Sequence, residues 1–409
     1  YKRQYYDNKT RRPYEAYDYN ILHETFNYGI GAQYMINKGN YITADCYADH
    51  FSSSYCFFKD NKTYNGKAGE EQVRKRTRNH NLSIKGIFKL GNRHKLSVGT
   101  EYIVDVLKSQ TDNIAKEDAY TLALFAQDEI KSLRNLQALI GVRYIYHENF
   151  KNHATPNVAL MYKPGKFNFR ASYAAGFRTP TLSELYATDI AKKNDRLTIG
   201  NLDLKPEKNN YFSLSAEYVH ERFSVSVNAF YNNIRDMIDY NTIATGDKAM
   251  EQYGHKEVRQ RDNIAEAKVH GINVSANAYL GAGFNLSGGY THLNTQDVEL
   301  EQPIDKSIKN AYNINAQWAH SWKIYRLNIN LNGRFNSKRF SKSYGYAPEY
   351  QLWDLNTRHS FNLKSVIIEP GCGMENLFDY MDDRPYNSNY ATLTPGRSFY
   401  ISLSLKFKS

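Results

Sequence analysis

Cysteine, proline and long apolar runs are scarce in this chain of 409 residues, which holds three cysteines and ten prolines. Cys46 and Cys56 fall in one expected strand, about 33 Å apart at 3.3 Å per residue, which is too far for a disulfide. We therefore expect free thiols at these positions and at Cys372. No stretch approaches the roughly 18 to 20 consecutive apolar residues of a transmembrane helix. These absences exclude a disulfide-built domain and a helical membrane protein.

Enzyme signatures are also missing from the sequence. It contains no G-x-S-x-G, no H-E-x-x-H and no phosphate-binding glycine loop. We predict that the protein is not an enzyme and has no cofactor. A lipase or protease with Ser, His and Asp on separate strands is an alternative, because such a site is found by geometry and not by spacing. Asp236 with Asp239, and Asp382 with Asp383, lack the dense acidic loop of a calcium site, so no bound metal is expected.

The formal net charge is +11. Lys and Arg are scattered over expected loops and strands and form no basic helix or stripe, which argues against a nucleic-acid partner. Excess cations on exposed loops suit a surface that faces anionic lipid headgroups or captures an anionic ligand.

Apolar and polar residues alternate with period two along most of the chain, which indicates β-strands. We expect about 17 strands, most of about nine to fourteen residues, where soluble strands have about five or six and a tilted membrane strand needs about nine to eleven. Length therefore favours a membrane barrel over the alternative, a soluble β-protein. Three of the apolar faces are Leu96, Val98, Tyr102, Val104 and Val106; Leu136, Ala138, Ile140, Val142, Tyr144 and Tyr146; and Phe223, Val225, Val227, Ala229 and Tyr231.

Aromatic residues are abundant, with 35 Tyr and 20 Phe. Many stand near expected strand ends, where membrane barrels carry interfacial girdles. Tyr is also a good strand former, so its abundance has a second explanation. The tyrosines at these ends are Tyr34, Tyr41, Tyr144, Tyr146, Tyr162, Tyr173 and Tyr231.

Short and long connections alternate along the chain, which is typical of an outer-membrane β-barrel with short periplasmic turns and long extracellular loops. Tight turns are expected at 37–39, 91–93, 163–166, 220–221, 280–283 and 364–365, and long polar stretches at 58–71, 177–206, 236–265, 293–309, 337–350 and 379–394. Bacterial single-chain barrels close with an even number of strands. An odd count of 17 predicts that a strand lies before Tyr1, or that one has been miscounted.

Three segments carry a family resemblance: 175–186 (AGFRTPTLSELY), 200–207 (GNLDLKPE), and 375–379 (ENLFD) with 395–400 (PGRSFY). They resemble, in order, the G-F-R-x-P, G-N-P-x-L-K-P-E and C-terminal E-N-L-F-D and P-G-R boxes of TonB-dependent outer-membrane receptors. Leu202 stands where that family often has Pro, and Lys408 and Ser409 follow the expected terminal aromatic Phe407.

The resemblance implies that residues 1–409 are a transmembrane antiparallel β-barrel, part of a 22-stranded barrel in the outer membrane of a Gram-negative bacterium. The family's N-terminal plug, which TonB contacts, is not recognisable, so the plug and about five strands are expected to precede Tyr1. Implied partners are the TonB–ExbB–ExbD energy-coupling complex, outer-membrane lipid with lipopolysaccharide, and a small-molecule nutrient. A surface lipoprotein is a further partner left open.

Two prolines in these boxes have a physical role of their own. Pro180 and Pro206 lack a ladder N–H and hold the preceding residue extended. They are expected to close the strand that ends near Gly176 and to open the strand 211–219. The boxes are therefore first boundary devices and second candidates for ligand contact.

Ligand capture would use the Arg and Tyr side chains of the long connections, because they suit an anionic aromatic chelate through charge-assisted hydrogen bonds and cation–π contacts. The alternative is that exposed polar loops often carry Tyr without binding anything. The connection 236–265 also contributes Arg261 to the Arg and Tyr side chains available for capture. The candidate ligand-binding residues are Arg178, Tyr186, Tyr240, Tyr253, His255, Arg259, Arg339, Tyr344, Tyr346, Arg384, Tyr386 and Tyr390.

The predicted function is that of a receptor that binds a scarce nutrient at its extracellular loops and imports it to the periplasm with energy from TonB. An iron chelate, siderophore or haem, is the first choice of cargo, and cobalamin is the second. Residues 181–200 contain no His, so haem ligation from that loop is excluded and only His255 nearby could serve. A passive porin and an adhesive barrel are the alternatives from other classes.

Overall fold

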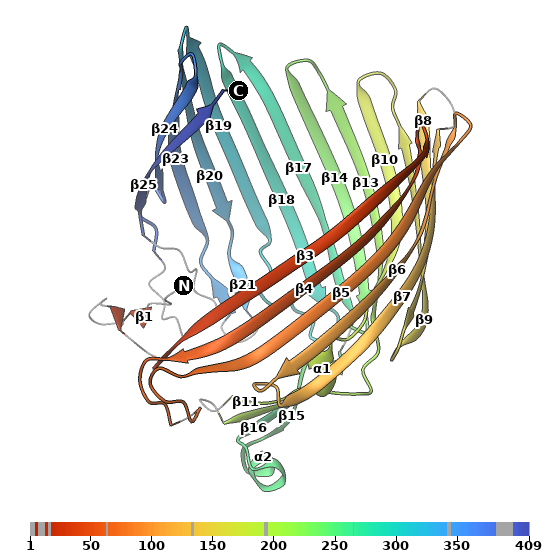
Figure 1. Ribbon diagram of the computed structural model, residues 1–409, viewed down its shortest axis with the longest axis vertical. Coiled ribbons are helices and arrows are strands. Elements are labelled where there is room, and N and C mark those ends of the chain that lie inside the picture. The colour runs from red at the N-terminus through yellow and green to blue at the C-terminus, as the bar shows by residue number, and fades with distance from the viewer. Residues whose placement is uncertain are drawn as a thin grey trace. The chain divides into compact units, whose positions relative to one another are not determined.

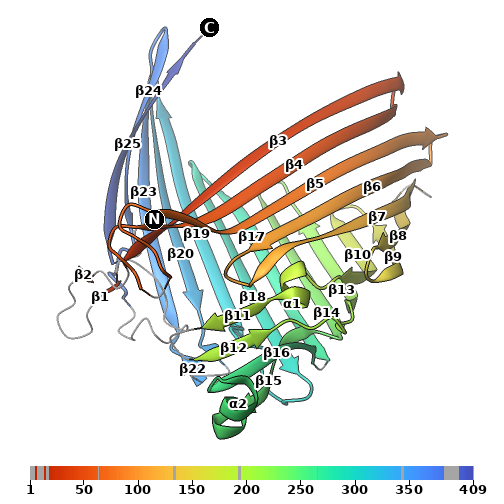
Figure 2. The ribbon, with the colours of Figure 1, turned by 60° about the horizontal axis from the view of Figure 1, so that its bottom comes forward.

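The computed structural model of the protein describes residues 5–6, 13–14, 18–62, 64–131, 135–191, 195–264, 266–341, 345–381 and 396–408. Strands dominate it, as Figures 1 and 2 show. The helices are α1 (Leu182–Tyr186) and α2 (Gly246–Tyr253). The strands are β1 (Tyr5–Tyr6), β2 (Pro13–Tyr14), β3 (Tyr19–Asn37), β4 (Asn40–Phe57), β5 (Glu71–Leu90), β6 (His94–Ser109), β7 (Ile114–Lys131), β8 (Leu136–His147), β9 (Lys151–Tyr162), β10 (Phe167–Arg178), β11 (Thr188–Ala191), β12 (Arg196–Ile199), β13 (Glu207–Val219), β14 (Phe223–Arg235), β15 (Ile238–Thr245), β16 (Glu257–Asn263), β17 (Ala267–Gly281), β18 (Phe284–Asp297), β19 (Asn310–Trp322), β20 (Tyr325–Asn336), β21 (Arg339–Ser341), β22 (Gly345–Ala347), β23 (Tyr350–Asn362), β24 (Val366–Glu375) and β25 (Ser398–Phe407).

Seventeen strands belong to one barrel sheet, which confirms the predicted fold class and count. They are β3–β10, β13, β14, β17–β20 and β23–β25. No plug-like domain is found among the described residues. No helix in the described ranges is long and apolar enough to cross a membrane.

The chain divides into two compact units. Unit 1 comprises residues 1–160, 173–211 and 234–266, and contains the hairpins from β3 to β8. Unit 2 comprises residues 161–172, 212–233 and 267–409, and contains the hairpins from β17 to β20 and from β23 to β25. The sites described below lie in unit 1.

The barrel strands of unit 1 are longer than the sequence predicted. Strands β3, β4, β5, β6 and β7 have 19, 18, 20, 16 and 18 residues. The sequence predicted about nine to fourteen residues for most strands, and these five exceed that range, because polar residues continue the pairing past the apolar stretch that marks each strand in the sequence. Other barrel strands, such as β8 and β14 with 12 and 13 residues, have the predicted length.

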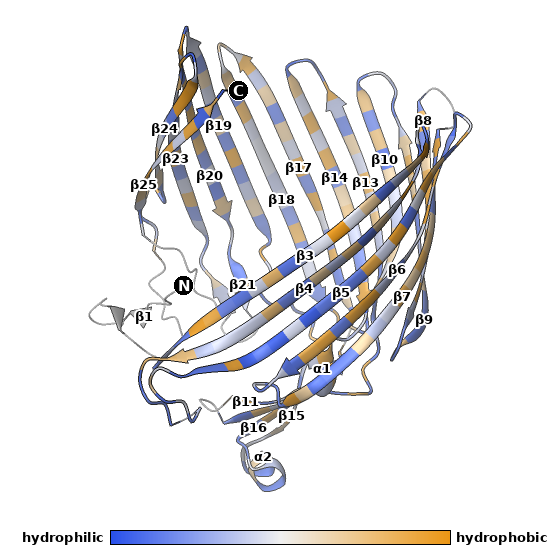
Figure 3. Ribbon diagram, in the orientation of Figure 1, coloured by the Kyte–Doolittle hydropathy of each residue, from blue (hydrophilic) through white to orange (hydrophobic). Residues whose placement is uncertain are grey.

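Alternate faces of each strand have different chemistry, which Figure 3 shows as changing colours along β3 to β5. On β5 the large apolar side chains Leu82 and Ile84 are 48% and 44% exposed. On the opposite face Asn81 donates to Glu101 of β6, and Arg143 of β8 pairs with the same carboxylate. The apolar face is the one that suits lipid, and the face with paired polar groups lines the interior.

The short connections are tight turns that need left-handed backbone. Gly39 has φ 107°, and the turn between β17 and β18 contains Gly281, Ala282 and Gly283 with φ of 90°, 49° and 86°. Cys46 and Cys56 lie in β4 as expected, and both are free, as is Cys372.

Two boundaries differ from their predictions by a few residues. β10 runs on to Arg178, two residues past Gly176, and β13 begins at Glu207, directly after Pro206 and ahead of the predicted start at Tyr211. The segment 375–379 also lies at a strand end, because β24 ends at Glu375 and Asn376 follows in left-handed conformation with φ 52°.

The two longest polar connections of unit 1, expected as loops, fold together. Strands β11 and β12 from the first connection and β15 and β16 from the second form a four-stranded sheet in the order β11-β12-β16-β15, in which β12 and β16 are parallel. Helix α2 lies against β15 and β16 (Figure 2). We call this unit of β11, β12, β15, β16 and α2 the loop sheet. Its strands are short, so the sequence pattern that marks the barrel strands does not appear in them.

Candidate functional site

Arg178, at the end of β10, joins the barrel to the loop sheet. Its Nε lies 2.7 Å from Oε2 of Glu207, and another of its nitrogens lies 2.6 Å from Oε1 of the same carboxylate. It also donates to both oxygens of Glu184 in α1, at 2.9 and 3.3 Å. Glu207 accepts a further bond of 2.8 Å from the backbone N–H of Ile238, the first residue of β15. One guanidinium thus connects β10, α1, β13 and β15.

A capping box starts α1. The Thr181 hydroxyl accepts from the Glu184 backbone N–H at 3.2 Å, and the Glu184 carboxylate accepts from the Thr181 N–H at 2.8 Å. Burial opposes the charge of Glu184, but the hydrogen bonds from Arg178 and Thr181 prevail and lower the pKa of its carboxyl below the ordinary value. The sequence T-L-S-E at 181–184 has the pattern of a capping box, with Thr at the N-cap and Glu three residues later. This helix start was not among the predicted features.

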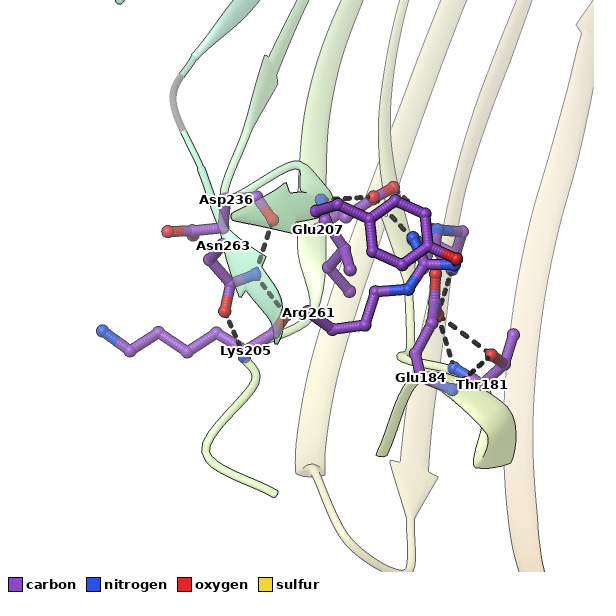
Figure 4. A network of polar contacts seen from close by, with 10 residues as sticks. Thr181, Glu184, Lys205, Glu207, Asp236, Arg261 and Asn263 are labelled. Carbon is purple, nitrogen blue, oxygen red and sulfur yellow. Dashed lines mark hydrogen bonds and ion pairs between the residues drawn. The ribbon is translucent and has the colours of Figure 1, made fainter. Parts of the chain in front are cut away.

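Asn263, the last residue of β16, holds the second box in place (Figure 4). Its Oδ1 accepts from the Lys205 N–H at 2.7 Å, and its Nδ2 donates to the carbonyls of Lys205 and Asp236 at 2.8 and 2.7 Å. Gly200 in the same box has no room for a side chain, because an added Cβ would lie 2.5 Å from the carbonyl oxygen of Leu185. The predicted structural role of both boxes therefore has a geometric basis.

Two apolar clusters attach α1 to the ends of the barrel strands. Leu107 of β6 and Ile114 of β7 pack with Ala187, and Leu182 and Tyr186 pack against them. Leu185, Leu204 and Ile238 form the second cluster, which Phe150 and Tyr186 adjoin. Asp112, between β6 and β7, adds polar ties, because its side chain accepts from Ser183 at 3.2 Å and its carbonyl from the Thr188 N–H at 2.7 Å.

The loop sheet has one apolar and one charged face. Leu197, Ala244 and Val258 form the apolar face, which packs with Ala249 of α2. The strand register places Arg196, Arg259 and Arg261 on the opposite face, because Arg196 pairs with Glu257 and Thr198 with Arg259, two residues along each strand. Tyr240 of β15 pairs with Arg261, so it shares that face. We call Arg196, Tyr240, Arg259 and Arg261 the cation–aromatic face.

The ring of Tyr240 contacts two guanidinium groups. The Cζ atoms of Arg259 and Arg261 lie 4.4 and 3.6 Å from the centre of its ring, and Arg261 donates to its hydroxyl at 2.8 Å. Figure 4 shows Arg261 reaching across this region. Cation–π contacts hold the three side chains together.

The charge on this face is incompletely balanced. The buried Nε–H groups of Arg196 and Arg259 have no hydrogen-bond acceptor in the described part of the chain, and the nearest oxygen of Glu257 lies 3.8 Å from Nε of Arg259. Burial and the positive charge of Arg196 lower the pKa of Arg259, against the opposing effect of Glu257 and Tyr240. An anion placed between the two guanidinium groups would satisfy both N–H groups and relieve the repulsion.

Asp189 of β11 faces the same two arginines. Burial and the charge of Asp112 raise the pKa of its carboxyl, although Arg196 and Arg259 act in the opposite direction. Asp189 is also close enough to Tyr55 of β4 to interact with it electrostatically. The charged face of the loop sheet is therefore turned toward the ends of β4 and the connection between β6 and β7.

A second group of aromatic residues and a cation lies at those strand ends. Tyr19 stacks on Tyr55 with ring centres 4.3 Å apart, and Tyr64 meets Tyr55 edge-on at 5.2 Å. Arg74 of β5 lies over both Tyr55 and Tyr64, at 5.2 and 5.4 Å from the ring centres, and donates to Gln110 at 3.2 Å. Arg and Tyr side chains are therefore grouped both on the cation–aromatic face of the loop sheet and at the ends of the neighbouring barrel strands.

The predicted candidates have different surroundings. Arg178 and Tyr186 are held by the ion pairs and apolar clusters described above, Tyr253 packs against the apolar face of the loop sheet, and Nδ1 of His255 lies 2.9 Å from Asp195. Tyr240 and Arg259 come together on the cation–aromatic face. Arg339 and Tyr346 lie in unit 2, in the hairpin β21–β22. Tyr344, Arg384, Tyr386 and Tyr390 lie outside the described residues. For each of these residues a ligand-binding role stays a prediction.

Sequence reasoning missed several residues of the region, among them Arg196, Arg74, Tyr19, Tyr55 and Tyr64. Arg196 gave no signal, because its nearness to Arg259 depends on a parallel pairing between two separate connections. Tyr19, Tyr55 and Arg74 lie in barrel strands near their ends, and Tyr64 lies in the connection between β4 and β5, so their grouping depends on how β3, β4 and β5 pair. In the described ranges no group of three or more His, Cys, Asp and Glu could hold a metal ion.

Comparison with known proteins identifies related barrels. A family model described as "TonB dependent receptor-like, beta-barrel" matches residues 1–376. Proteins of this family are receptors and transporters of the outer membrane. The match covers most of the chain.

Solved structures of similar fold include siderophore receptors. A variant of the ferric enterobactin receptor PfeA from Pseudomonas aeruginosa has a TM-score of 0.76 at 18% identity, over 95% of this chain and 62% of that chain. The siderophore receptor PirA from Acinetobacter baumannii has a TM-score of 0.74 at 16% identity, with 95% and 63% covered. The ferric preacinetobactin receptor BauA from the same species has a TM-score of 0.66 at 15% identity, with 95% and 63% covered. This chain spans less than two thirds of their length, and at such identities the similarity shows the fold alone.

Proposed function

The chain belongs to the TonB-dependent receptor β-barrel family, and from this premise we propose that it is the barrel of an outer-membrane receptor for a ferric siderophore. The siderophore binds at the cation–aromatic face and enters the periplasm with energy from the TonB–ExbB–ExbD complex. The protein is a transporter and not an enzyme, and it works in the outer membrane of a Gram-negative bacterium. Three siderophore receptors with the same fold support this choice of cargo.

One observation carries the proposal. Arg196 and Arg259 each have a buried Nε–H without an acceptor among the described residues, and the Arg259 guanidinium lies over the ring of Tyr240. A buried donor without a partner costs about 1 to 3 kcal/mol, so an anionic oxygen from a ligand is favoured here. Ferric siderophores with catecholate or carboxylate groups supply such oxygens, and an aromatic catechol can also stack against Tyr240.

Haem is less well supported as cargo, because the one His identified as a potential ligand, His255, is engaged by Asp195. Cobalamin and passive diffusion predict no special use for paired arginines at the loop sheet. The binding titration below distinguishes haem and cobalamin from a siderophore, and a liposome experiment tests passive diffusion.

The test is a titration of the full-length receptor in detergent with ferric enterobactin, haemin and cyanocobalamin, read by intrinsic tyrosine and tryptophan fluorescence. We expect submicromolar binding of the ferric siderophore. Replacing Arg196 and Arg259 together with Gln should weaken it about 100-fold, because two charge-assisted hydrogen bonds are worth roughly 1.5 kcal/mol each. The matched control, Arg93→Gln with Arg222→Gln, removes the same charge from two exposed turn residues and should bind normally.

Three results would contradict the proposal. Siderophore binding that survives the double substitution would place the ligand elsewhere. Tight binding of cyanocobalamin or haemin alone would assign a different cargo. Ligand-independent passage of small sugars into liposomes that contain the full-length receptor would indicate a passive pore.

A further inference from the structure

The turn between β8 and β9, residues 148–150, supports the segment that anchors the loop sheet. Phe150 of this turn packs against the second apolar cluster. That cluster consists of Leu185 of α1, Leu204 of the second box and Ile238, the first residue of β15. The position of the turn therefore affects both α1 and the start of β15. The turn itself is held by two histidines that use their rings in different ways.

His147, the last residue of β8, holds the turn through a ring nitrogen that carries no proton. The residue is only 7% exposed. Its Nδ1 lies 3.1 Å from the backbone nitrogen of Asn149, and a backbone N–H can only donate. Nδ1 is therefore the acceptor, and the ring is neutral with its proton on Nε2. The same ring contacts Phe150, with ring centres 5.1 Å apart.

His153 of β9 holds the other side of the turn through a nitrogen that does carry a proton. Its Nε2 lies 3.0 Å from the carbonyl oxygen of Phe150. A carbonyl oxygen can only accept, so Nε2 donates, and it donates whether the ring is neutral or positively charged. Uptake of a second proton therefore leaves the bond of His153 intact, whereas it breaks the bond that His147 accepts.

Two carboxylates stand ready for a protonated His147. The titratable and charged groups of the elements around it are Asp105 of β6, Glu148 and Lys151 at the turn, His153 of β9 and Tyr186 of α1. The neighbouring strand β7 presents the uncharged Thr121 opposite it. Asp105 and Glu148 favour a positive charge on the ring, and His153 opposes it. Burial disfavours a charged ring, so His147 takes up a proton by leaving its buried position.

Glu148 stays in place when the rest of the turn moves. Its N–H donates to the carbonyl of Tyr120 in β7 at 3.0 Å, and its carboxylate accepts from the Tyr120 N–H at 3.3 Å. The bonds of Asn149 and Phe150 described above run to the two histidines instead. Movement at the turn is therefore confined to Asn149 and Phe150, and Phe150 is the residue that contacts the second apolar cluster.

We propose that His147 is a pH-sensitive switch that controls the anchor of the loop sheet. As the pH falls below the ordinary histidine value of about 6.5, Nδ1 takes up a proton from solvent and the Asn149 N–H loses its acceptor. The charged ring turns out of its buried position toward Asp105 and Glu148. Phe150 then leaves the second apolar cluster, so α1 and the start of β15 lose support. The anchor is closed at neutral pH and opens in acid.

The test is hydrogen-exchange mass spectrometry of the full-length receptor in detergent at pH 7.5 and 5.5, expressed as protection relative to the intrinsic exchange rate at each pH. Both pH values lie above the range in which Glu184 takes up a proton. A ring that is neutral in the closed turn and titrates normally in the open turn makes opening about tenfold more frequent at pH 5.5. We expect the protection of residues 148–150, 182–187 and 238–245 to fall by that factor.

Two substitutions separate the histidines. His147→Asn should remove the difference between the two pH values, because an Asn side-chain oxygen accepts from the N–H two residues later and does not titrate. His153→Gln is the matched control. Its amide can still donate to the carbonyl of Phe150, so the tenfold fall in protection should remain.

Three outcomes overturn the proposal. They are equal protection of the unmodified protein at both pH values, a fall that persists in His147→Asn, and loss of the fall in His153→Gln. If His147→Asn fails to assemble, Phe150→Ala takes its place. It should lower the protection of residues 182–187 already at pH 7.5 and leave no further fall at pH 5.5, and a further tenfold fall would refute the switch. These measurements need no cargo, so failure here is distinct from failure of the proposed function.

Discussion

Removing Arg178 tests whether the G-F-R segment at 176–178 fixes the loop sheet to the barrel. The substitution Arg178→Gln leaves the carboxylates of Glu184 and Glu207, whose side chains are only 13% and 16% exposed, without their cation. Each charge-assisted hydrogen bond of this kind is worth about 1.5 to 3 kcal/mol. Because the Arg178 side chain is 42% exposed, solvent screening reduces the combined effect, and we expect a loss of about 2 kcal/mol.

The loss should appear as local opening and not as unfolding of the barrel. Glu207 accepts hydrogen bonds from both Arg178 and the N–H of Ile238, so we expect the loss of Arg178 to weaken the anchor of β15 and β16. Backbone amides of residues 238–263 should exchange with solvent about 30-fold faster, since 2 kcal/mol corresponds to that factor in an opening equilibrium. Hydrogen-exchange mass spectrometry on the full-length receptor measures this directly.

Arg170→Gln is the matched control, because Arg170 is an exposed arginine on the same strand and its side chain, among the described residues, donates to the sulfur of Met161 and to no carboxylate. Exchange in the loop sheet should be unchanged by it. If Arg178→Gln left exchange within about twofold of the unmodified protein, or if Arg170→Gln raised it equally, the assignment of Arg178 as the anchor would be refuted.

Three further predictions concern α1 and the loop sheet. The pKa of Glu184 is lowered, so the stability that its ionised carboxylate contributes is complete above the ordinary carboxyl value of 4.5 and is lost as the pH falls below it. Protease cleavage near α1 should therefore increase at acidic pH, below this value. The substitution Glu184→Gln should abolish that pH dependence. Asp189→Asn removes a carboxylate whose pKa is raised and whose charge repels anions, so it should tighten binding of an anionic siderophore about fivefold at neutral pH, whereas weaker binding would show that Asp189 contacts the ligand. Val258 has no exposed surface, so Val258→Ala opens a cavity and should lower the local free energy of unfolding by about 2 kcal/mol. The control Val219→Ala, at a residue that is 42% exposed, should change it by less than about 0.5 kcal/mol. Proteolysis of both variants measures the difference.

The barrel itself was determined by local sequence pattern. A strand such as Leu136–His147 alternates apolar and polar side chains because one face meets lipid and the other the interior, so each strand can be recognised from its own residues. Turns such as Asn37–Asn40 are equally local, since glycine in left-handed conformation marks them. The class, the count of 17 and the alternation of short and long connections could therefore be predicted.

The lengths of β3 to β7 could not be predicted, because their extra residues are polar and are held by pairing with neighbours and not by an apolar face. The same reason applies to the loop sheet. Strand β12 pairs in parallel with β16, across a separation that includes two barrel strands, and neither segment has an alternating pattern long enough to be recognised alone.

The sequence by itself thus determined a membrane barrel and pointed to Arg and Tyr in its long connections as capture residues. Only the tertiary structure decided how those residues are used. It placed Arg178 in ion pairs, directed Tyr253 to the apolar side of the loop sheet, and brought Arg196 next to Arg259 and Tyr240. Periodicity is a property of neighbouring residues in one strand, whereas a charged cluster depends on which distant strands pair and in which register, and that is settled only when the chain folds.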